Sequence, residues 1–146
     1  MIHLAYWLVK TEPEEYSYFD LERLGRDRWN GVRNLRAIKY MKGMIPGDLV
    51  FIYHTGKEKA IIGVAEVASL PYPDPEAMDP KFMVVDLIPR YPLPRTVSLK
   101  TIKQNPFFGG WQLISEPRLS VMPVNGEHWE LVLRIAGARN ENFIGE

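Results

Sequence analysis

The feature that most constrains this chain is a series of short apolar segments bounded by glycine, proline and asparagine turn signals. Apolar runs of roughly four to eight residues between such signals are typical of buried strands. The predicted strands are Tyr6–Val9, Leu49–His54, Ile61–Val67, Phe82–Ile88 and Arg118–Pro123. They do not alternate with helices, which argues against a Rossmann fold. The pattern favours an α+β domain, a small mixed sheet or barrel flanked by short helices.

Capping residues predict where the short helices begin. Ser17 with Asp20 resembles a capping box, and Asn34, Ser98 and Asn125 are suited to the N-cap position. The predicted helices run from Phe19 to Leu24, from Leu35 to Lys42, from Leu99 to Gln104, and onward from Asn125. Their spacing assigns Trp7 and Trp129 to the core. The place of Trp111 is left open.

Composition excludes several classes of function. The chain has 146 residues, which suits a single domain over residues 1–146, and it has no cysteine, so thiolate metal sites and disulfides are excluded. His3, His54 and His128 lack metal-ligand spacing, and no phosphate-loop, dinucleotide or nucleophile motif is present, so we predict no metal, no cofactor and no enzyme activity. No leader or membrane span is recognised, and we expect a cytoplasmic monomer that does not contact membranes.

Charge is unevenly distributed along the chain. The 18 basic and 18 acidic side chains balance, which argues against a general polyanion binder. Within Arg23–Lys42, however, seven basic residues accompany one acid, Asp27, and Trp29 precedes the Asn30–Gly31 turn. Arginines pair with phosphates and an indole stacks on a base, so the segment suits nucleic acid. The same pattern also fits a solvated helix face with a core tryptophan.

The order of short motifs resembles the EVE domain family over nearly the whole chain. The matching segments are Tyr6–Pro13, Trp29–Asn34, Met41–Lys42, Pro46–Asp48, Phe51–His54, Gly63–Val67, Tyr72–Pro75 and Arg118–Val124, followed by Trp129. The chain departs from the commonest family pattern at Asn30, where aspartate is more frequent, and at Leu35, where tyrosine is frequent. Residues 89–110 match poorly.

The resemblance implies a PUA-like fold, a small curved mixed β-barrel flanked by short helices and related to YTH domains. It also implies a non-catalytic module that binds DNA or RNA and reads a modified base, such as methylated or hydroxymethylated cytosine or methylated adenine. We expect an aromatic pocket in which Trp29 stacks on the base. The other residues assigned to the base are the amides of Gly31 and Val32, the side chains of Ser17 or Asn34, the pocket wall of Tyr53 and His54, and Ser120. Those assigned to phosphate are Lys10, Arg33 and Arg118.

Two alternatives remain open. An enzyme acting on a nucleotide or small metabolite in the same pocket would use His54, Lys10 and Glu12 as its titrating groups. A protein-interaction module would use the basic segment against an acidic partner, and its binding would not depend on base identity. Which polymer, base and modification is bound does not follow from the sequence.

Overall fold

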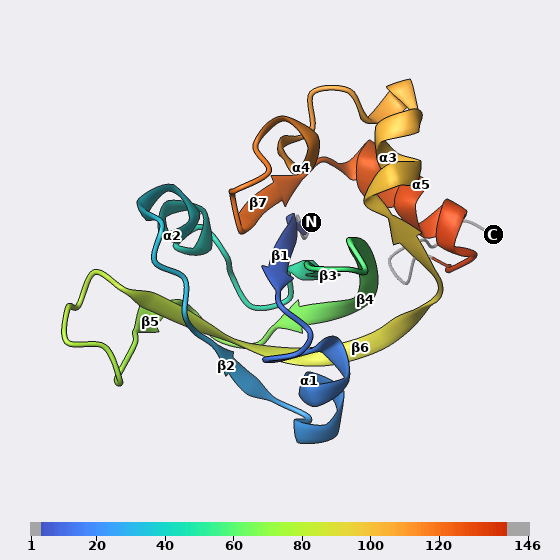
Figure 1. Ribbon diagram of the computed structural model, residues 1–146. Helices are drawn as coiled ribbons and strands as arrows, with labels where there is room; N and C mark the ends of the chain where they lie inside the picture. The colour runs from blue at the N-terminus through green and yellow to red at the C-terminus, as the bar shows by residue number, and fades with distance from the viewer. Residues whose placement is uncertain (1–3, 140–146) are drawn as a thin grey trace.

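The computed structural model describes residues 4–139, where short helices flank a curved sheet (Figure 1). The strands are β1 (Tyr6–Thr11), β2 (Asp27–Trp29), β3 (Leu49–His54), β4 (Ala60–Val67), β5 (Tyr72–Pro73), β6 (Met83–Ser98) and β7 (Val121–Val124). The helices are α1 (Tyr18–Leu24), α2 (Leu35–Met41), α3 (Leu99–Gln104), the short 3-10 helix η1 (Pro106–Phe108), α4 (Gln112–Ser115) and α5 (Gly126–Ala136).

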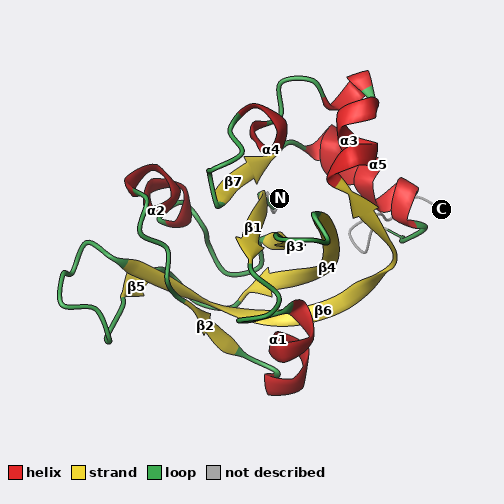
Figure 2. Cartoon of the chain, viewed as in Figure 1, coloured by secondary structure: helices red, strands yellow, loops and turns green. Residues whose placement is uncertain are grey.

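The sheet is mixed and curls into a half-barrel. Its strand order is β2-β6-β4-β3-β1-β7, and β5 pairs with the beginning of β6. β1 and β3 are parallel, with Thr11 opposite His54, whereas the other pairs are antiparallel. The strands occupy the centre and the helices the margin (Figure 2). The expected fold class, a small curved mixed sheet flanked by short helices, is therefore confirmed.

The helices begin at the predicted caps. The Ser17 hydroxyl accepts the Asp20 N–H and the Asp20 carboxylate accepts the Ser17 N–H, which completes the capping box before α1. Asn34 and Asn125 cap α2 and α5 with their side-chain oxygens. Gly25 ends α1 in the left-handed region, at φ 80°. Local hydrogen bonding thus accounts for the boundaries of these helices.

Three strand predictions need correction. β6 has 16 residues and continues beyond the predicted end at Ile88, because Pro89 and Pro92 lie opposite β4 where the register shifts. β2 forms inside the predicted loop by pairing with β6. β7 starts at Val121 rather than Arg118, and it tolerates Pro123 because it is an edge strand of the sheet.

Aromatic stacking fills the core beneath α5. The Trp129 ring is fully buried and stacks on Phe51 and Tyr6, with ring centroids 3.7 Å and 4.5 Å away. Trp7 is also buried, so both core assignments are confirmed. Trp111, unassigned from the sequence, is only 3% exposed and joins the core.

A buried carboxylate ties the start of β1 to the turn before β3. Asp48 is inaccessible to solvent. Its Oδ2 accepts the Trp7 indole N–H at 2.9 Å and the Ile45 N–H at 3.0 Å, and its Oδ1 accepts the Ala5 N–H at 3.2 Å. These bonds hold β1 beside β3, and the end of β1 carries part of the site described next.

A close approach fixes α1 against the sheet. A Cβ atom at Gly63 of β4 would lie 2.7 Å from the Tyr18 ring, which leaves no room for a side chain. The Tyr18 ring is fully buried. Gly63 therefore sets how closely α1 packs on β4.

Candidate functional site

A cavity of about 380 Å³ lies where the two ends of the curled sheet approach each other. One wall comes from the end of β1 and the residue before β7, and the other from β2 and the turn that follows it (Figure 1). The lining residues are Lys10, Thr11, Tyr16, Asp27, Arg28, Trp29, Asn30, Gly31, Val32, Glu76 and Ser120. We call this cavity the seam pocket.

The β1 wall supplies a half-buried cation. The Lys10 ammonium donates to the Pro117 carbonyl at 2.8 Å and lies 5.6 Å from the Tyr53 ring centroid. Burial lowers the pKa of Lys10. The backbone is held as well, because the Lys10 N–H donates to the Ser120 carbonyl at 2.9 Å. An ammonium has three N–H donors, so Lys10 keeps donors for a ligand.

The aromatic part of the pocket combines two rings. Trp29 is 6% exposed and belongs to both the core and the pocket lining, so it offers a ligand only a small part of its ring. Tyr16 is less buried and meets Trp29 edge to face, with centroids 5.7 Å apart. The Tyr16 hydroxyl donates to Asp27 Oδ2 at 2.7 Å. Burial and this hydrogen bond raise the pKa of Tyr16, so the phenol stays protonated.

Polar groups of β2 complete the wall. Asp27 Oδ1 accepts the Arg28 N–H at 2.8 Å, and the Arg28 guanidinium pairs with Glu76 at 3.0 Å. The Arg28 Nε is buried without a hydrogen-bond partner. Gly31 has φ 83°, a left-handed conformation in which a side chain would be strained, so glycine suits this position of the segment after β2. The pocket therefore offers carboxylate acceptors, cationic donors and turn amides within one cavity.

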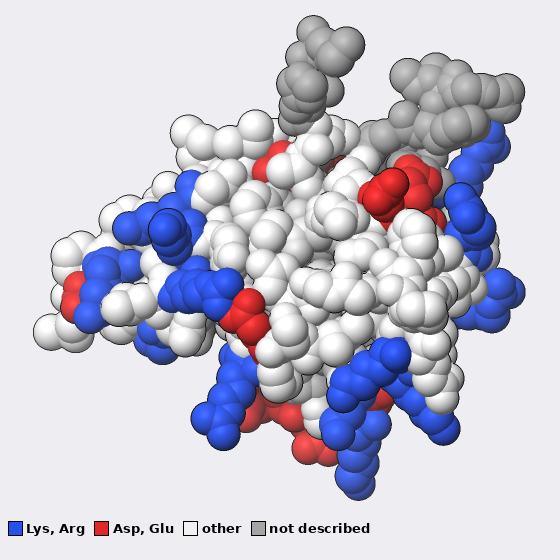
Figure 3. All heavy atoms as spheres, turned by 90° about the horizontal axis from the view of Figure 1, so that it is seen from above, with Lys and Arg blue, Asp and Glu red and all other residues white. Residues whose placement is uncertain are grey.

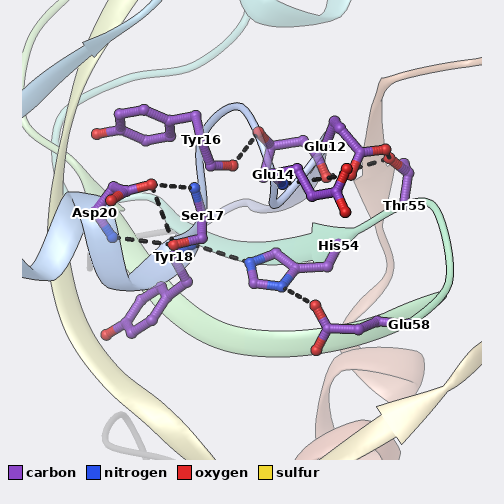
Figure 4. A network of polar contacts seen from close by, with 10 residues as sticks. Glu12, Glu14, Tyr16, Ser17, Tyr18, Asp20, His54, Thr55 and Glu58 are labelled. Atoms are coloured by element: carbon purple, nitrogen blue, oxygen red, sulfur yellow. Dashed lines mark hydrogen bonds and ion pairs between the residues drawn. The ribbon is translucent and has the colours of Figure 1, made fainter.

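The residues predicted for the pocket wall do not line the seam pocket. Tyr53 is buried beneath Lys10 and does not line the seam pocket. His54 Nε2 accepts the Tyr18 N–H at 3.0 Å, and its Nδ1 lies 2.8 Å from Glu58, so Nδ1 carries the proton of the neutral ring (Figure 4). His54 is thus a buried structural residue that ties α1 to β3.

Ser17 and Asn34 are also absent from the lining. Both use their side-chain oxygens to cap helices, Ser17 at the start of α1 and Asn34 at the start of α2. Of the base-contact candidates, the structure brings together Trp29, Gly31, Val32 and Ser120.

The three predicted phosphate residues do not lie together. Lys10 lines the seam pocket, whereas Arg118 lines another hollow beside α2, with Asn34 and Glu116. Arg33 donates to the Val32 carbonyl at 3.2 Å, and its guanidinium lies 4.4 Å from the Phe82 ring centroid.

The basic segment is less positive than its sequence indicates. Acids pair with most of its arginines, in the ion pairs Arg23–Asp20, Arg26–Asp86, Arg28–Glu76 and Arg36–Glu116. In one view of the surface, Lys and Arg form separate groups around a large uncharged area, with acidic groups between some of them (Figure 3). The folded segment therefore presents no continuous cationic face.

Sequence reasoning missed part of the pocket lining, namely Thr11, Tyr16, Asp27, Arg28, Asn30 and Glu76. The Thr11 hydroxyl donates to the Tyr16 carbonyl at 2.6 Å, so the turn after β1 brings Tyr16 back to the pocket. In the sequence, the second aromatic residue of the pocket could have been found from Tyr16, which directly precedes the capping box.

Among residues 4–139, no cluster of His, Asp or Glu is arranged to hold a metal ion. His3 lies outside the described residues. No helix in the same part of the chain is long and apolar enough to cross a bilayer.

The curled mixed sheet, with a pocket at its seam, defines a PUA-like domain. The end of β1 and the whole of β2 form walls of this pocket. The family model of the EVE domain matches residues 5–135, and the chain belongs to the EVE domain family. The resemblance expected from the sequence is confirmed.

Solved structures and curated relatives agree with this assignment. A protein from Rhodopseudomonas palustris is 40% identical, with 92% of this chain and 94% of that chain covered and a TM-score of 0.87. Thymocyte nuclear protein 1 of Gallus gallus is 29% identical over 168 residues, which cover 92% of this chain and 69% of the relative. Human THYN1, solved in complex with DNA containing 5-methylcytosine, is 25% identical, with 93% and 99% coverage and a TM-score of 0.85.

Proposed function

We propose that this protein is a non-catalytic reader that binds nucleic acid and holds one modified base in the seam pocket. The observation that carries the proposal is a cavity with aromatic and polar walls in a fold shared with human THYN1, whose structure contains 5-methylcytosine DNA. The candidate bases are methylated or hydroxymethylated cytosine and methylated adenine.

The pocket chemistry suits a base that has left its stack. Flipping a base out of a duplex costs a few kcal/mol, which ring contacts and hydrogen bonds to the base edge must offset. The Tyr16 ring and the accessible part of Trp29 supply ring contact. Cytosine and adenine both carry an exocyclic amino group, and Asp27 is a carboxylate acceptor in the wall. We assign Asp27 as the acceptor for that amino group.

Recognition of the methyl group itself is weak. One methyl in a fitted apolar site contributes about 1–3 kcal/mol. Selectivity for the modified base over the plain one is therefore modest, roughly tenfold to two-hundredfold. Lys10 and the turn amides at Gly31 and Val32 hold the phosphates and the base edge.

The enzyme alternative has less support. Its principal titrating residue, His54, is 2% exposed and bonded through both ring nitrogens, outside the seam pocket. Lys10 remains in the pocket, but no histidine among residues 4–139 lines the pocket beside it to act as a general base.

The test is a binding panel of modified and plain oligonucleotides, single- and double-stranded. Asp27→Asn keeps the size of the side chain but replaces one acceptor oxygen by a donor, and should weaken binding of the preferred base about tenfold or more. Trp29→Phe keeps an aromatic ring at this core position and should also weaken binding. Phe107→Ala removes an exposed aromatic ring outside the pocket and serves as the control. Equal affinity for modified and plain bases, or unchanged affinity in both pocket variants, refutes the reader function.

A further inference from the structure

Four lysines lie around one hollow between the β3–β4 turn and α3. Lys57 and Lys59 lie in the β3–β4 turn, and Lys100 and Lys103 lie on α3. All four are exposed, and together they line a hollow of about 450 Å³. We call this set the hairpin patch.

The backbone beneath the hairpin patch is held in place. Lys59 adopts φ 45°, a left-handed conformation that is uncommon for a residue with a side chain. Its carbonyl accepts the Leu99 N–H at 2.8 Å, so the turn is bonded to the start of α3. Ala60 pairs with Ser98 directly beside this hydrogen bond. The two pairs of lysines are therefore presented together rather than on independent loops.

The positive charge of the hairpin patch is not neutralised. Glu58 is the acid that lines the same hollow, and its carboxylate lies 2.8 Å from His54 Nδ1. None of the four lysines has an ion pair within residues 4–139. The basic segment differs, because its arginines are largely paired with acids. The hairpin patch is thus a stronger candidate for phosphate binding than the segment that is most basic in sequence.

Strand pairing relates the hairpin patch to the seam pocket. Thr11, which lines the pocket, pairs with His54; His54 pairs with Ala60; and Ala60 pairs with Ser98, which lines the hollow of the patch. Three steps of about 4.8 Å between strands make a path of about 14 Å along the curved sheet from Thr11 to Ser98. This distance corresponds to about four base-pair steps of 3.4 Å along a duplex.

Acidic groups separate the two sites. The Glu12 carboxylate accepts the Glu14 N–H at 3.3 Å and the Thr55 hydroxyl at 3.5 Å, so it lies against the start of the β3–β4 turn, and the Glu14 side chain is beside it (Figure 4). They repel a backbone that would follow the surface continuously. The arrangement suits two separated binding points on one polymer, as a duplex provides.

We propose that the hairpin patch binds backbone phosphates of the same duplex whose modified base occupies the seam pocket, about four base pairs from that base and on one side only. This inference rests on the proposed function. The basic segment does not provide the second binding point.

The experiment uses duplexes with one modified base, lengthened on one side at a time from about two to about ten flanking base pairs. Three double variants, each with two charges removed, are compared with the unchanged protein: Lys57→Gln/Lys59→Gln, Lys100→Gln/Lys103→Gln and, as the matched control, Lys39→Gln/Lys42→Gln. Lys39 and Lys42 are exposed at α2, across the molecule from α3 (Figure 1). Thermal unfolding of each variant checks that the fold is retained.

We expect the unchanged protein to bind more tightly once the flank on one side exceeds about four base pairs, by roughly tenfold at low salt. Both hairpin-patch variants should abolish this gain, and the slope of log affinity against log salt should fall by about 0.9 for each phosphate that is no longer bound. The α2 variant should retain the gain. The inference is overturned if extension has no effect, if both sides act equally, or if the patch variants behave like the α2 variant. If modified single strands bind and no modified duplex does, the inference is overturned and the proposed function stands. Failure of every modified oligonucleotide, single- or double-stranded, to bind the unchanged protein refutes the proposed function itself.

Discussion

Replacing Asp48 by asparagine should lower the free energy of unfolding by about 4 kcal/mol. The buried carboxylate accepts three N–H groups, from the Trp7 indole and from the Ile45 and Ala5 amides. Asparagine offers one acceptor oxygen, and its amino group must then face an N–H. One charge-assisted bond is broken, at about 1.5–3 kcal/mol, and two are weakened to neutral bonds by roughly 1 kcal/mol each.

Urea unfolding followed by circular dichroism measures this change, and the melting temperature should fall by roughly 8–16 °C for a domain of about this size. Asp74→Asn is the matched control, because Asp74 is 5% exposed and its Oδ1 accepts one amide, from Glu76 at 2.9 Å. It should cost about 1 kcal/mol. A loss below about 1 kcal/mol for Asp48→Asn, or a larger loss for Asp74→Asn, would refute the reasoning.

Three further changes test other parts of the structure. Gly63→Ala places a Cβ 2.7 Å from the Tyr18 ring and should cost about 1–3 kcal/mol in urea unfolding, whereas Gly126→Ala, with open space around its Cβ, should not destabilise the protein. His54→Phe leaves the buried Tyr18 N–H without its acceptor and should cost about 1–3 kcal/mol; oligonucleotide affinity should stay unchanged, and a specific loss of affinity would contradict the structural role. Burial alone raises the pKa of Asp86, but the Tyr72 hydroxyl and the Arg26 guanidinium outweigh it and lower the pKa. Its stabilising contribution is therefore present above the unfolded pKa of about 3.9 and is lost as the pH falls through the lower folded pKa, so melting curves between about pH 6 and 3 should show a shallower acid decline in Asp86→Asn.

Local signals explain which elements could be predicted. The caps at Ser17, Asn34, Ser98 and Asn125 act within three residues of themselves, so the sequence contains the whole interaction. The second half of β6 is not predicted by local sequence, because prolines are disfavoured inside strands. They are tolerated where the pairing with β4 is irregular, and that irregularity belongs to the folded sheet.

The pocket could be predicted only in part, because its walls meet through the curl of the sheet. Trp29 and the turn after it carried a local signal, whereas Glu76 reaches Arg28 from 48 residues away. Tyr53 and His54 lie outside the pocket lining for another reason. Every residue of β3 is buried, so the strand has no face turned to a pocket. Period-two alternation, which would have placed one of them outward, does not apply to a strand covered on both sides.

The pairing of β1 with β7 sets the order in which this protein can become functional during its synthesis. Val9 pairs with Val121, and the pocket needs both Lys10 and Ser120, so a ribosome must deliver nearly the whole chain before the site exists. Until then one edge of β1 has no partner, and an unpaired apolar edge invites association with other nascent chains. An incomplete chain is therefore at once unable to bind and prone to aggregate. The protein can therefore bind its ligand only after β7 has been translated.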